Sequence, residues 1–453
     1  MYKKNVWLEQ SQSKEKIFKY AEGYKDFLTR SKTERLFVKN SVALLEQNGF
    51  KEFKGQKLNP GDRVYLVNRK KCLAAFVIGS NPIQDGMLIL GAHIDSPRLD
   101  IKQNPLYEKD EFALLDTHYY GGIKKYQWTA RALAIHGVCC LKDGSEVDIH
   151  IGDEENDPIL GVGDLLIHLA KEQMGKTLGQ AIVGENLDLT VGNIPLNKDE
   201  KDAVKKNVLN ILKDKYHIEE EDLLSAELEV VPAMKTRDYG LDRSMIAGYG
   251  HDDKVCSYTS LTALIDAKAQ KRTLCCILTD KEEVGSIGAT GAQSVFFENA
   301  VAQLIKAQGE SDAMYLTRIC FNNSKMLSSD VSAGFDPLYP EVNDPKNTCH
   351  LSYGIVFNKY TGSGGKSGSN DASAEFIAEV RKAMDDNNIC YQTAELGKVD
   401  AGGGGTIAYI LGNYNMDVID AGVGVLNMHA PMEIVSKADV YEAYLAYLAF
   451  LKI

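Results

Sequence analysis

The segment TLCCILTDKEEVGSIGATGAQS, residues 273–294, begins as an apolar run, continues into two adjacent carboxylates and ends in glycine and other small residues. The apolar run at 273–278 predicts a buried strand, and the residues from Ser286 predict the start of a helix. Glu282 and Glu283 therefore lie at the carboxyl end of a strand, where open α/β sheets place their ligand sites. Two neighbouring carboxylates repel each other unless a cation neutralises them, so the segment indicates a cation site in an α/β fold.

Helix and strand patterns continue on the N-terminal side of this segment. Residues 12–48 have helical periodicity and predict two amphipathic helices, and residues 63–79 predict a hairpin of two strands. Residues 86–97, GMLILGAHIDSP, form a nearly continuous apolar run that ends in a polar turn. This pattern predicts a central strand that is covered on both faces.

The alternation of helix and strand patterns stops at about Asp100 and resumes at about Met234. Strand-like segments at 131–141 and 146–152 lie between these points, followed by a highly charged stretch at 197–222. We therefore expect an α/β domain formed by residues 1–100 and 235–453, interrupted by a smaller β-rich domain at 101–234.

The composition is that of a soluble globular protein, with 453 residues, 44% hydrophobic and 25% charged. The net charge of −12 makes nucleic acid an unexpected partner. No apolar segment approaches the ~20 residues of a membrane helix, and the charged N-terminus lacks the apolar core of a signal peptide. The nine cysteines include no C-x-x-C pair, which favours buried, reduced thiols in a cytoplasmic protein.

Four further places carry side chains that could share a cation with the glutamate pair. Each lies at a strand end or in a polar turn, and the candidates are His93 with Asp95, Asp252 with Asp253, Asp330, and His429. Taken one at a time they have structural explanations, because a carboxylate commonly caps a helix or forms a turn and a lone histidine is commonly structural. Taken together, two histidines and several carboxylates at element ends indicate a metal site.

The chemistry that needs this set is a pair of divalent metal ions about 3.5–4 Å apart. Imidazole and carboxylate ligands suit zinc, with cobalt or manganese as substitutes. One carboxylate must bridge the ions, and each ion then takes one histidine and one further carboxylate. One glutamate of the pair can bind metal while its neighbour acts as a general base toward water. Asp95 is spaced to orient the imidazole ring of His93.

The motifs GAHIDSP, DKEEVGS, SSDVSAGFDPLYP and NMHAPMEI resemble those of the M18 metallo-aminopeptidases, the aspartyl aminopeptidase family. The resemblance runs over nearly the whole chain and keeps the order of the motifs. It implies a zinc-exopeptidase-like mixed sheet flanked by helices, and a dinuclear-zinc enzyme that removes N-terminal residues from peptides. Carried over motif by motif, the implied metal ligands are His93, Asp252, Glu283, Asp330 and His429, the implied base is Glu282, and the implied orienting residue is Asp95.

The bridging ligand stays open between two residues. Family members often have Asp-Asn where this chain has Asp252-Asp253, and we take Asp252 because Asp253 replaces the asparagine. The sequence does not exclude Asp253.

The resemblance also implies that the inserted domain builds subunit contacts and that the subunits form a tetrahedral dodecamer around an inner chamber. The segment DLLIHLAKEQ, residues 164–173, resembles the part of the insertion whose histidine reaches a neighbouring subunit's active site. That histidine is His168 here. The alternative is an ordinary histidine on an amphipathic helix.

One segment departs from the family's pattern. Many members have a strand like VIKVN whose lysine receives the acidic side chain of the substrate, whereas this chain has GIVFNKYTGSGGKSGSND at 354–371. Asn358 takes the lysine position, and Lys359 falls on the other face of the strand. We therefore expect Asn358 to contact a neutral or apolar N-terminal residue of the substrate, unless the glycine-rich loop presents Lys366 to the pocket.

Two other functions compete with that of an aminopeptidase. A related dinuclear hydrolase, such as a carboxypeptidase or a deacylase, would share the broad fold. A catalytically silent oligomeric binding protein predicts a missing ligand or base, and none is missing from the sequence. A dizinc aminopeptidase therefore remains the leading hypothesis.

Overall fold

The computed structural model describes residues 4–9 and 13–453, so Gln12, the first residue of the segment predicted to be helical, lies outside the described residues. The chain divides into two compact units. The larger unit comprises the residues through Asp95, Thr236–Met428 and Glu433–Ile453. The inserted unit comprises Ser96–Lys235 and His429–Met432.

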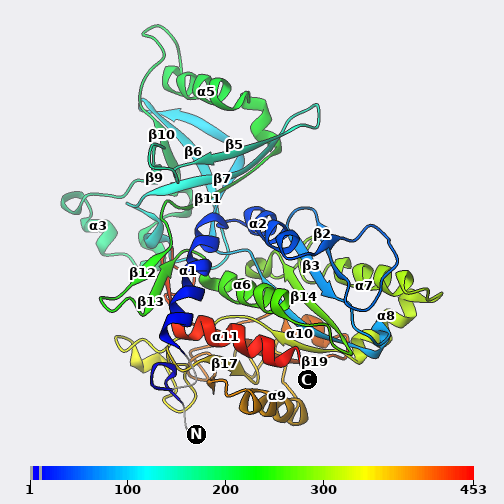
Figure 1. Ribbon diagram of the computed structural model, residues 1–453. Coiled ribbons are helices and arrows are strands. Elements are labelled where there is room, and N and C mark those ends of the chain that lie inside the picture. Colours follow the sequence, from blue (N-terminus) through cyan, green and yellow to red (C-terminus); the bar gives the residue numbers. More distant parts are fainter. Residues whose placement is uncertain (1–3, 10–12) are drawn as a thin grey trace. The chain divides into compact units, whose positions relative to one another are not determined.

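A nine-stranded mixed sheet forms the centre of the larger unit (Figure 1). Its strand order is β1 (Lys51–Glu52), β2 (Arg63–Asn68), β3 (Cys72–Val77), β14 (Thr273–Thr279), β4 (Met87–His93), β15 (Lys325–Ser328), β19 (Asp417–Gly422), β17 (Ile355–Asn358) and β18 (Tyr391–Thr393). Strands β14, β4, β15 and β19 run parallel, whereas β3 is antiparallel to β14 and β17 is antiparallel to β19. The predicted hairpin at 63–79 and the predicted central strand at 86–97 are confirmed as β2–β3 and β4.

Helices cover both faces of this sheet. One core cluster joins one face to α1 (Lys14–Arg30), α2 (Glu34–Gln47), α6 (His251–Asp266), α9 (Ala374–Asp386) and α11 (Lys437–Phe450). A second cluster joins the other face to α7 (Phe296–Ala307), α8 (Ala313–Asn322) and α10 (Ala408–Gly412). Alternate strand residues enter opposite clusters, since Cys276 belongs to the first and Cys275 to the second. The predicted α/β fold, with a mixed sheet flanked by helices, is therefore confirmed.

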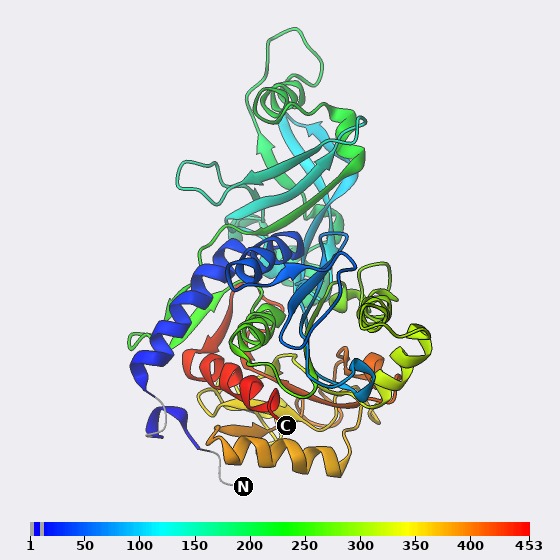
Figure 2. The same cartoon turned by 45° about the vertical axis from the view of Figure 1, so that its right-hand side comes forward.

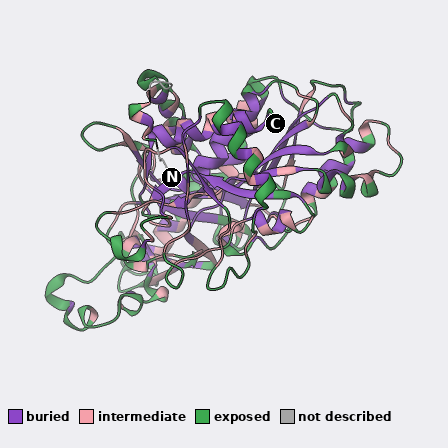
Figure 3. Ribbon diagram, turned by 90° about the horizontal axis from the view of Figure 1, so that it is seen from below, coloured by how far each residue is buried: buried purple, intermediate pink, exposed green. Residues whose placement is uncertain are grey.

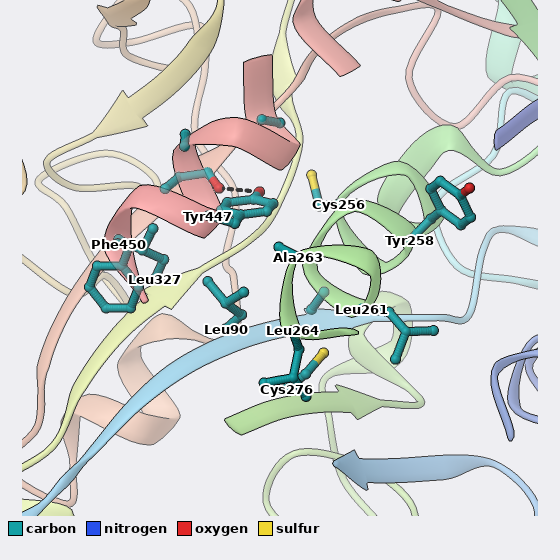
Figure 4. Packing of buried hydrophobic residues seen from close by; sticks show 14 of the residues in the cluster. Leu90, Cys256, Tyr258, Leu261, Ala263, Leu264, Cys276, Leu327, Tyr447 and Phe450 are labelled. Carbon is teal, nitrogen blue, oxygen red and sulfur yellow. Dashed lines mark hydrogen bonds between the residues drawn. The ribbon is translucent and has the colours of Figure 1, made fainter. Parts of the chain in front are cut away.

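Helix α6 occupies the middle of the first cluster and lies beside α11 (Figures 1 and 4). Leu264 and Cys276 are fully buried near its centre. The buried hydroxyl of Tyr447 donates to the carbonyl oxygen of Ala421 at 2.7 Å, so this polar group is paired. Because burying a leucine-sized side chain contributes about 1.5–3 kcal/mol, this packing holds α6 firmly against the sheet.

A five-stranded sheet also belongs to the larger unit. Its order is β12 (Arg237–Tyr239), β13 (Met245–Gly248), β21 (Glu433–Ser436), β20 (Gly424–Leu426) and β16 (Ser332–Ala333). Strand β13 leads directly into α6, and β21 pairs with β13 in antiparallel register. The pairing of β13 with β21 therefore positions the chain where α6 begins.

The inserted unit is β-rich, as predicted. Its seven-stranded sheet has the order β8 (Glu146–Ile151), β7 (Leu133–Cys140), β11 (Ala226–Pro232), β5 (Arg98–Lys109), β6 (Phe112–Tyr120), β10 (Leu189–Gly192) and β9 (Gly161–Val162). Its helices are α3 (Lys171–Met174), α4 (Leu178–Ala181) and α5 (Ala203–Tyr216). Helix α5 packs on β5, β6 and β10 (Figure 2).

The helix predicted from Ser286 is wrong, because α7 begins only at Phe296. Ser286 has a φ of 60°, and its neighbour Gly285 has a φ of 95°, which right-handed helices exclude. Thr290 Oγ1 then donates to Asp280 Oδ2 at 2.6 Å. Turns and a side-chain hydrogen bond therefore fold this segment back onto the end of β14.

Burial follows the layers, with buried residues on the strands and inner helices and exposed residues on the outer turns (Figure 3). All nine cysteines are free thiols, and eight of them are buried. Within the described ranges, no helix has the length and apolar character that crossing a membrane requires.

Candidate metal centre

Three parallel strands bring predicted residues to one edge of the nine-stranded sheet. Strand β4 ends at His93, β14 leads into the 3-10 helix η7 (Glu282–Val284), and β15 leads to Asp330. Because β14 and β15 both pair with β4 in parallel, these strand ends meet at the same edge. The two glutamates therefore lie at a carboxyl edge, as the sequence predicted.

The imidazole of His93 has a carboxylate near each ring nitrogen. Nε2 lies 3.3 Å from Asp252 Oδ1 and 3.9 Å from Glu282 Oε2. Nδ1 lies 3.2 Å from Asp95 Oδ1. A histidine that ligates a metal through Nε2 commonly donates its Nδ1 proton to such a carboxylate. The geometry therefore supports an orienting role for Asp95.

Asp95 also holds the glutamate pair through the backbone. Its Oδ1 accepts the N–H of Glu282 at 3.1 Å, and its Oδ2 accepts the N–H of Glu283 at 3.2 Å. Asp95 is fully buried, so these hydrogen bonds are shielded from water. One carboxylate thus fixes the end of β4 relative to η7.

Asp252 and Asp253 stand at the start of α6 with non-helical backbone angles, and the peptide bond between them is cis. Asp252 approaches the Nε2 of His93, as described above. Asp253 Oδ2 instead accepts the backbone N–H of His93 at 3.3 Å. Asp253 Oδ1 is buried and has no hydrogen-bond partner among the described residues. Asp252 therefore approaches the His93 imidazole at Nε2, whereas Asp253 bonds to the His93 backbone.

Burial raises the pKa of the Asp253 carboxyl group well above its usual value. Burial and the neighbouring Asp253 also raise the pKa of the Asp330 carboxyl group well above its usual value. Burial on its own would lower the pKa of His93, but hydrogen bonds to Asp252 and Asp95 raise it well above its ordinary value. The centre is thus a buried acidic cluster, which a divalent cation would stabilise.

The donor set of the larger unit fits a metal site. Ligand atoms of His93, Asp253 and Asp330 lie within 4.8 Å of one another, and so do those of His93, Glu282 and Glu283. Imidazole nitrogen and carboxylate oxygen are ligands that zinc accepts. The unpartnered Asp253 Oδ1 is a buried polar atom that a cation could satisfy.

His429, the fifth implied ligand, belongs to the inserted unit. Its Nδ1 lies 2.9 Å from the carbonyl oxygen of Gly122. A carbonyl oxygen only accepts hydrogen bonds, so Nδ1 carries the proton and Nε2 of the neutral ring keeps the lone pair that a metal needs. This tautomer is compatible with a ligand, and the role of His429 stays a prediction.

His168 is exposed in the 3-10 helix η4 (Ile167–Leu169) of the inserted unit. No α-helix forms at His168, because α3 begins only at Lys171 and has four residues. An ordinary surface histidine therefore stays the alternative. Its predicted role at a neighbouring active site remains a prediction.

Asn358 ends β17 and is buried, and its Nδ2 lies 3.5 Å from Ser332 Oγ. Lys359 Nζ lies 3.7 Å from Asp371 Oδ1, and Lys366 Nζ lies 3.1 Å from Asp371 Oδ2. Asp371 therefore holds both lysines in ion pairs at a half-exposed position. These contacts are compatible with a neutral group at the position of the family's lysine.

Glu433 lies within the NMHAPMEI motif but received no role from the sequence. It begins β21, is 1% exposed and accepts the backbone N–H of Asp252 through Oε2 at 3.0 Å. A glutamate directly before the apolar pair Ile434-Val435 is the signal that could have identified it, because glutamate is rarely fully buried unless it is paired.

Known proteins resemble this chain over its whole length. The family model described as Aminopeptidase I zinc metalloprotease (M18) matches residues 27–451. A Clostridium acetobutylicum protein named probable M18 family aminopeptidase 1 is 55% identical over 456 residues, which cover 99% of this chain and 98% of that protein. A crystal structure of an M18 aminopeptidase from Thermotoga maritima is 46% identical with a TM-score of 0.97, covering 100% of this chain and 99% of that one. The mApe1 dodecamer of S. cerevisiae, 20% identical with a TM-score of 0.77 over 95% of this chain and 96% of that one, has the same fold.

Proposed function

The chain belongs to the M18 family of aminopeptidase I zinc metalloproteases, and we propose that it removes N-terminal residues from peptides with two zinc ions and a glutamate base. The observation that carries this proposal is the buried acidic cluster around His93 at the carboxyl edge of the parallel strands. In the proposed centre Asp252 would be the ligand that the two ions share. The remaining ligands are His93, Glu283, Asp330 and His429, a set that cobalt or manganese could also use.

Each protein group has one task in the proposed mechanism. Bound zinc supplies Lewis-acid polarisation of the scissile carbonyl and lowers the pKa of water. Glu282, held through its backbone by Asp95, accepts a proton from the attacking water and passes it to the leaving amine. Asp95 also keeps a proton on Nδ1 of His93, which leaves Nε2 as the ligating atom.

Homo-oligomerisation is the second part of the proposal, with a tetrahedral dodecamer as the assembly. Exposed apolar side chains in one segment of the inserted unit support it, namely Leu165 52%, Leu166 56%, Ile167 68%, Leu169 69%, Met174 71% and Leu178 59%. Monomeric proteins rarely expose apolar surface of this extent, so the segment is suited to a subunit contact. His168 lies within it and is proposed to reach the active site of a neighbouring subunit.

Substrate preference follows from Asn358 in the proposed pocket. A buried pocket for aspartate or glutamate needs a fixed cation, because an unpaired buried carboxylate is costly. Asn358 offers a neutral amide, and the proposed substrates therefore carry neutral or apolar N-terminal residues. The free thiols of the nine cysteines suit a reducing compartment, and we propose a cytoplasmic location.

The test is turnover of amino-acyl anilides by enzyme loaded with zinc, cobalt or manganese. N-acyl amino acids and N-acylated peptides with a free carboxyl terminus serve as the comparison substrates. Hydrolysis of the anilides alone is the expected result. Preferential hydrolysis of the N-acyl substrates would indicate a deacylase, and preferential release of C-terminal residues would indicate a carboxypeptidase. Binding of peptides without turnover under all three metals would indicate a silent binding protein.

A further inference from the structure

The side chain of Glu433 reaches the backbone of Asp252 from a neighbouring strand. Glu433 is paired with Gly248 in the antiparallel register of β21 and β13, so its own backbone is fixed by the sheet. Its Oε2 accepts the N–H of Asp252 at 3.0 Å, and the donor and acceptor are 181 residues apart in the sequence. The contact therefore ties the start of α6 to the five-stranded sheet.

The N–H of Asp252 needs such a partner. The first four N–H groups of a helix have no acceptor within the helix, and Asp252 is the second residue of α6. Asp252 is 3% exposed, so water has little access to it. Leaving a buried donor without an acceptor destabilises the folded chain, so the loss of this acceptor would shift the turn.

The local backbone also makes the position of Asp252 sensitive to this contact. Gly250 has a φ of 75° and turns the chain between β13 and α6. Asp252 itself has φ −76° and ψ 110°, so its side-chain direction is not set by helical geometry. The hydrogen bond to Glu433 is one restraint on this turn, while the carboxylate of Asp252 approaches Nε2 of His93 at 3.3 Å.

We propose that Glu433 is a positioning residue for the metal centre. Its carboxylate holds the main chain at Asp252, and this keeps the Asp252 carboxylate at the bridging position. The inference rests on the proposed function, because it takes Asp252 as the bridging ligand. It predicts that removing the acceptor at Glu433 weakens metal binding even though Glu433 itself touches no metal.

The side chain at position 433 must place an acceptor oxygen within hydrogen-bond distance of the Asp252 N–H. Glutamine keeps an acceptor oxygen on a side chain of the same length, so Glu433→Gln restores most of the metal affinity. Aspartate is one methylene shorter, and β21 cannot follow it because the ladder with β13 fixes the backbone. Glu433→Asp therefore behaves like Glu433→Ala in metal binding while it retains a carboxylate.

Glu442 provides a matched control. It is also fully buried, and its Oε2 accepts the backbone N–H of Cys390 at 2.8 Å. It lies on α11 and has no assigned role in the metal centre. Glu442→Ala removes a buried carboxylate that accepts a backbone N–H. It therefore measures how much losing such a contact lowers the stability of the fold, without a change at the metal centre.

The experiment measures zinc affinity of the full-length variants by competition with a fluorescent chelator, together with thermal unfolding of the metal-free proteins. We expect Glu433→Ala and Glu433→Asp to weaken zinc binding by about 10–100-fold, the usual effect of losing a partner of a metal ligand. Glu433→Gln recovers most of this loss. Glu442→Ala lowers the unfolding temperature and keeps the wild-type zinc affinity. At subsaturating zinc, kcat falls in the Glu433→Ala variant and KM stays unchanged.

Wild-type zinc affinity in Glu433→Ala or in Glu433→Asp would overturn the inference, and the aspartate variant is informative even if the alanine variant fails to fold. Equal losses in Glu433→Ala and Glu442→Ala would also overturn it, because the effect would then be one of general stability. Asp252→Asn is measured alongside. If Asp252→Asn loses zinc and Glu433→Ala does not, the inference fails and the proposed function stands. If Asp252→Asn keeps zinc, the proposed ligand set fails.

Discussion

The substitution Glu282→Gln tests whether Glu282 is the general base and not a metal ligand. The Glu282 side chain is 17% exposed, and glutamine has the same shape, so the substitution leaves no cavity. The N–H of residue 282 still bonds to Asp95 Oδ1, which it meets at 3.1 Å. A neutral amide does not accept a proton from water at neutral pH. The variant therefore removes the proton acceptor and little else.

The expected loss follows from the role of a single positioned base. Removing such a base lowers kcat by about 10²–10⁴-fold, which corresponds to about 2.7–5.4 kcal/mol on the barrier. KM should change little, because the proton transfer occurs in the transition state. Metal content should stay at the wild-type level, because Glu282 is not one of the proposed ligands.

The assay is steady-state hydrolysis of a leucine anilide, with metal content measured by mass spectrometry on the same sample. Glu283→Gln is the matched control, because it changes the adjacent carboxylate, which is assigned to a metal ion. That control is expected to lose metal together with activity. If Glu282→Gln loses stoichiometric metal while Glu283→Gln retains it, the two roles are reversed. Full turnover by Glu282→Gln would refute the assignment of a base to this position.

Three further predictions concern the bridge, the assembly and the substrate. Asp252→Asn should reduce zinc content far more than Asp253→Asn, and the opposite ranking in metal analysis would move the bridge to Asp253. His168→Ala should lower turnover while light scattering shows an intact oligomer and metal analysis shows full zinc; a metal-loaded single subunit with full turnover would exclude this role. Because Asn358 carries no charge, kcat/KM should be higher for leucine and methionine anilides than for aspartate and glutamate anilides under identical metal loading. A clear advantage for the acidic anilides would contradict this, and Lys366→Ala would then test the glycine-rich loop as the source of the cation.

The sequence determined the framework of the larger unit because local periodicity reports which side chains must be buried. The apolar run of β4 predicted a strand covered on both faces, and that of β14 predicted a buried strand. Cys275 and Cys276 of β14 do enter opposite core clusters. The helical periodicity after residue 12 likewise matches α1 and α2. Polar residues at strand ends predicted a candidate metal site at the carboxyl edge of the sheet, since parallel strands bring their carboxyl ends together.

Residue periodicity gave wrong predictions where backbone angles and side-chain hydrogen bonds set the course of the chain. The apolar and small residues after Ser286 suggested a helix, but positive φ angles and the bond from Thr290 to Asp280 produce turns instead. The segment around His168 has helical spacing of its apolar residues, yet it forms only a 3-10 turn with exposed side chains. Neither outcome can be read from periodicity, because both depend on what the segment meets in space.

The arrangement of the metal centre was decided by tertiary structure alone. The sequence left Asp252 and Asp253 open, and only the fold directs one carboxylate to the His93 imidazole and the other to the His93 backbone. Glu433 was not identified at all, because its partner is 181 residues away and the contact is to a backbone N–H that no residue pattern marks. A sequence lists which donors and acceptors exist, whereas the pairing of strands and helices sets which of them stand within hydrogen-bond distance, and the chemistry of this site depends on those distances.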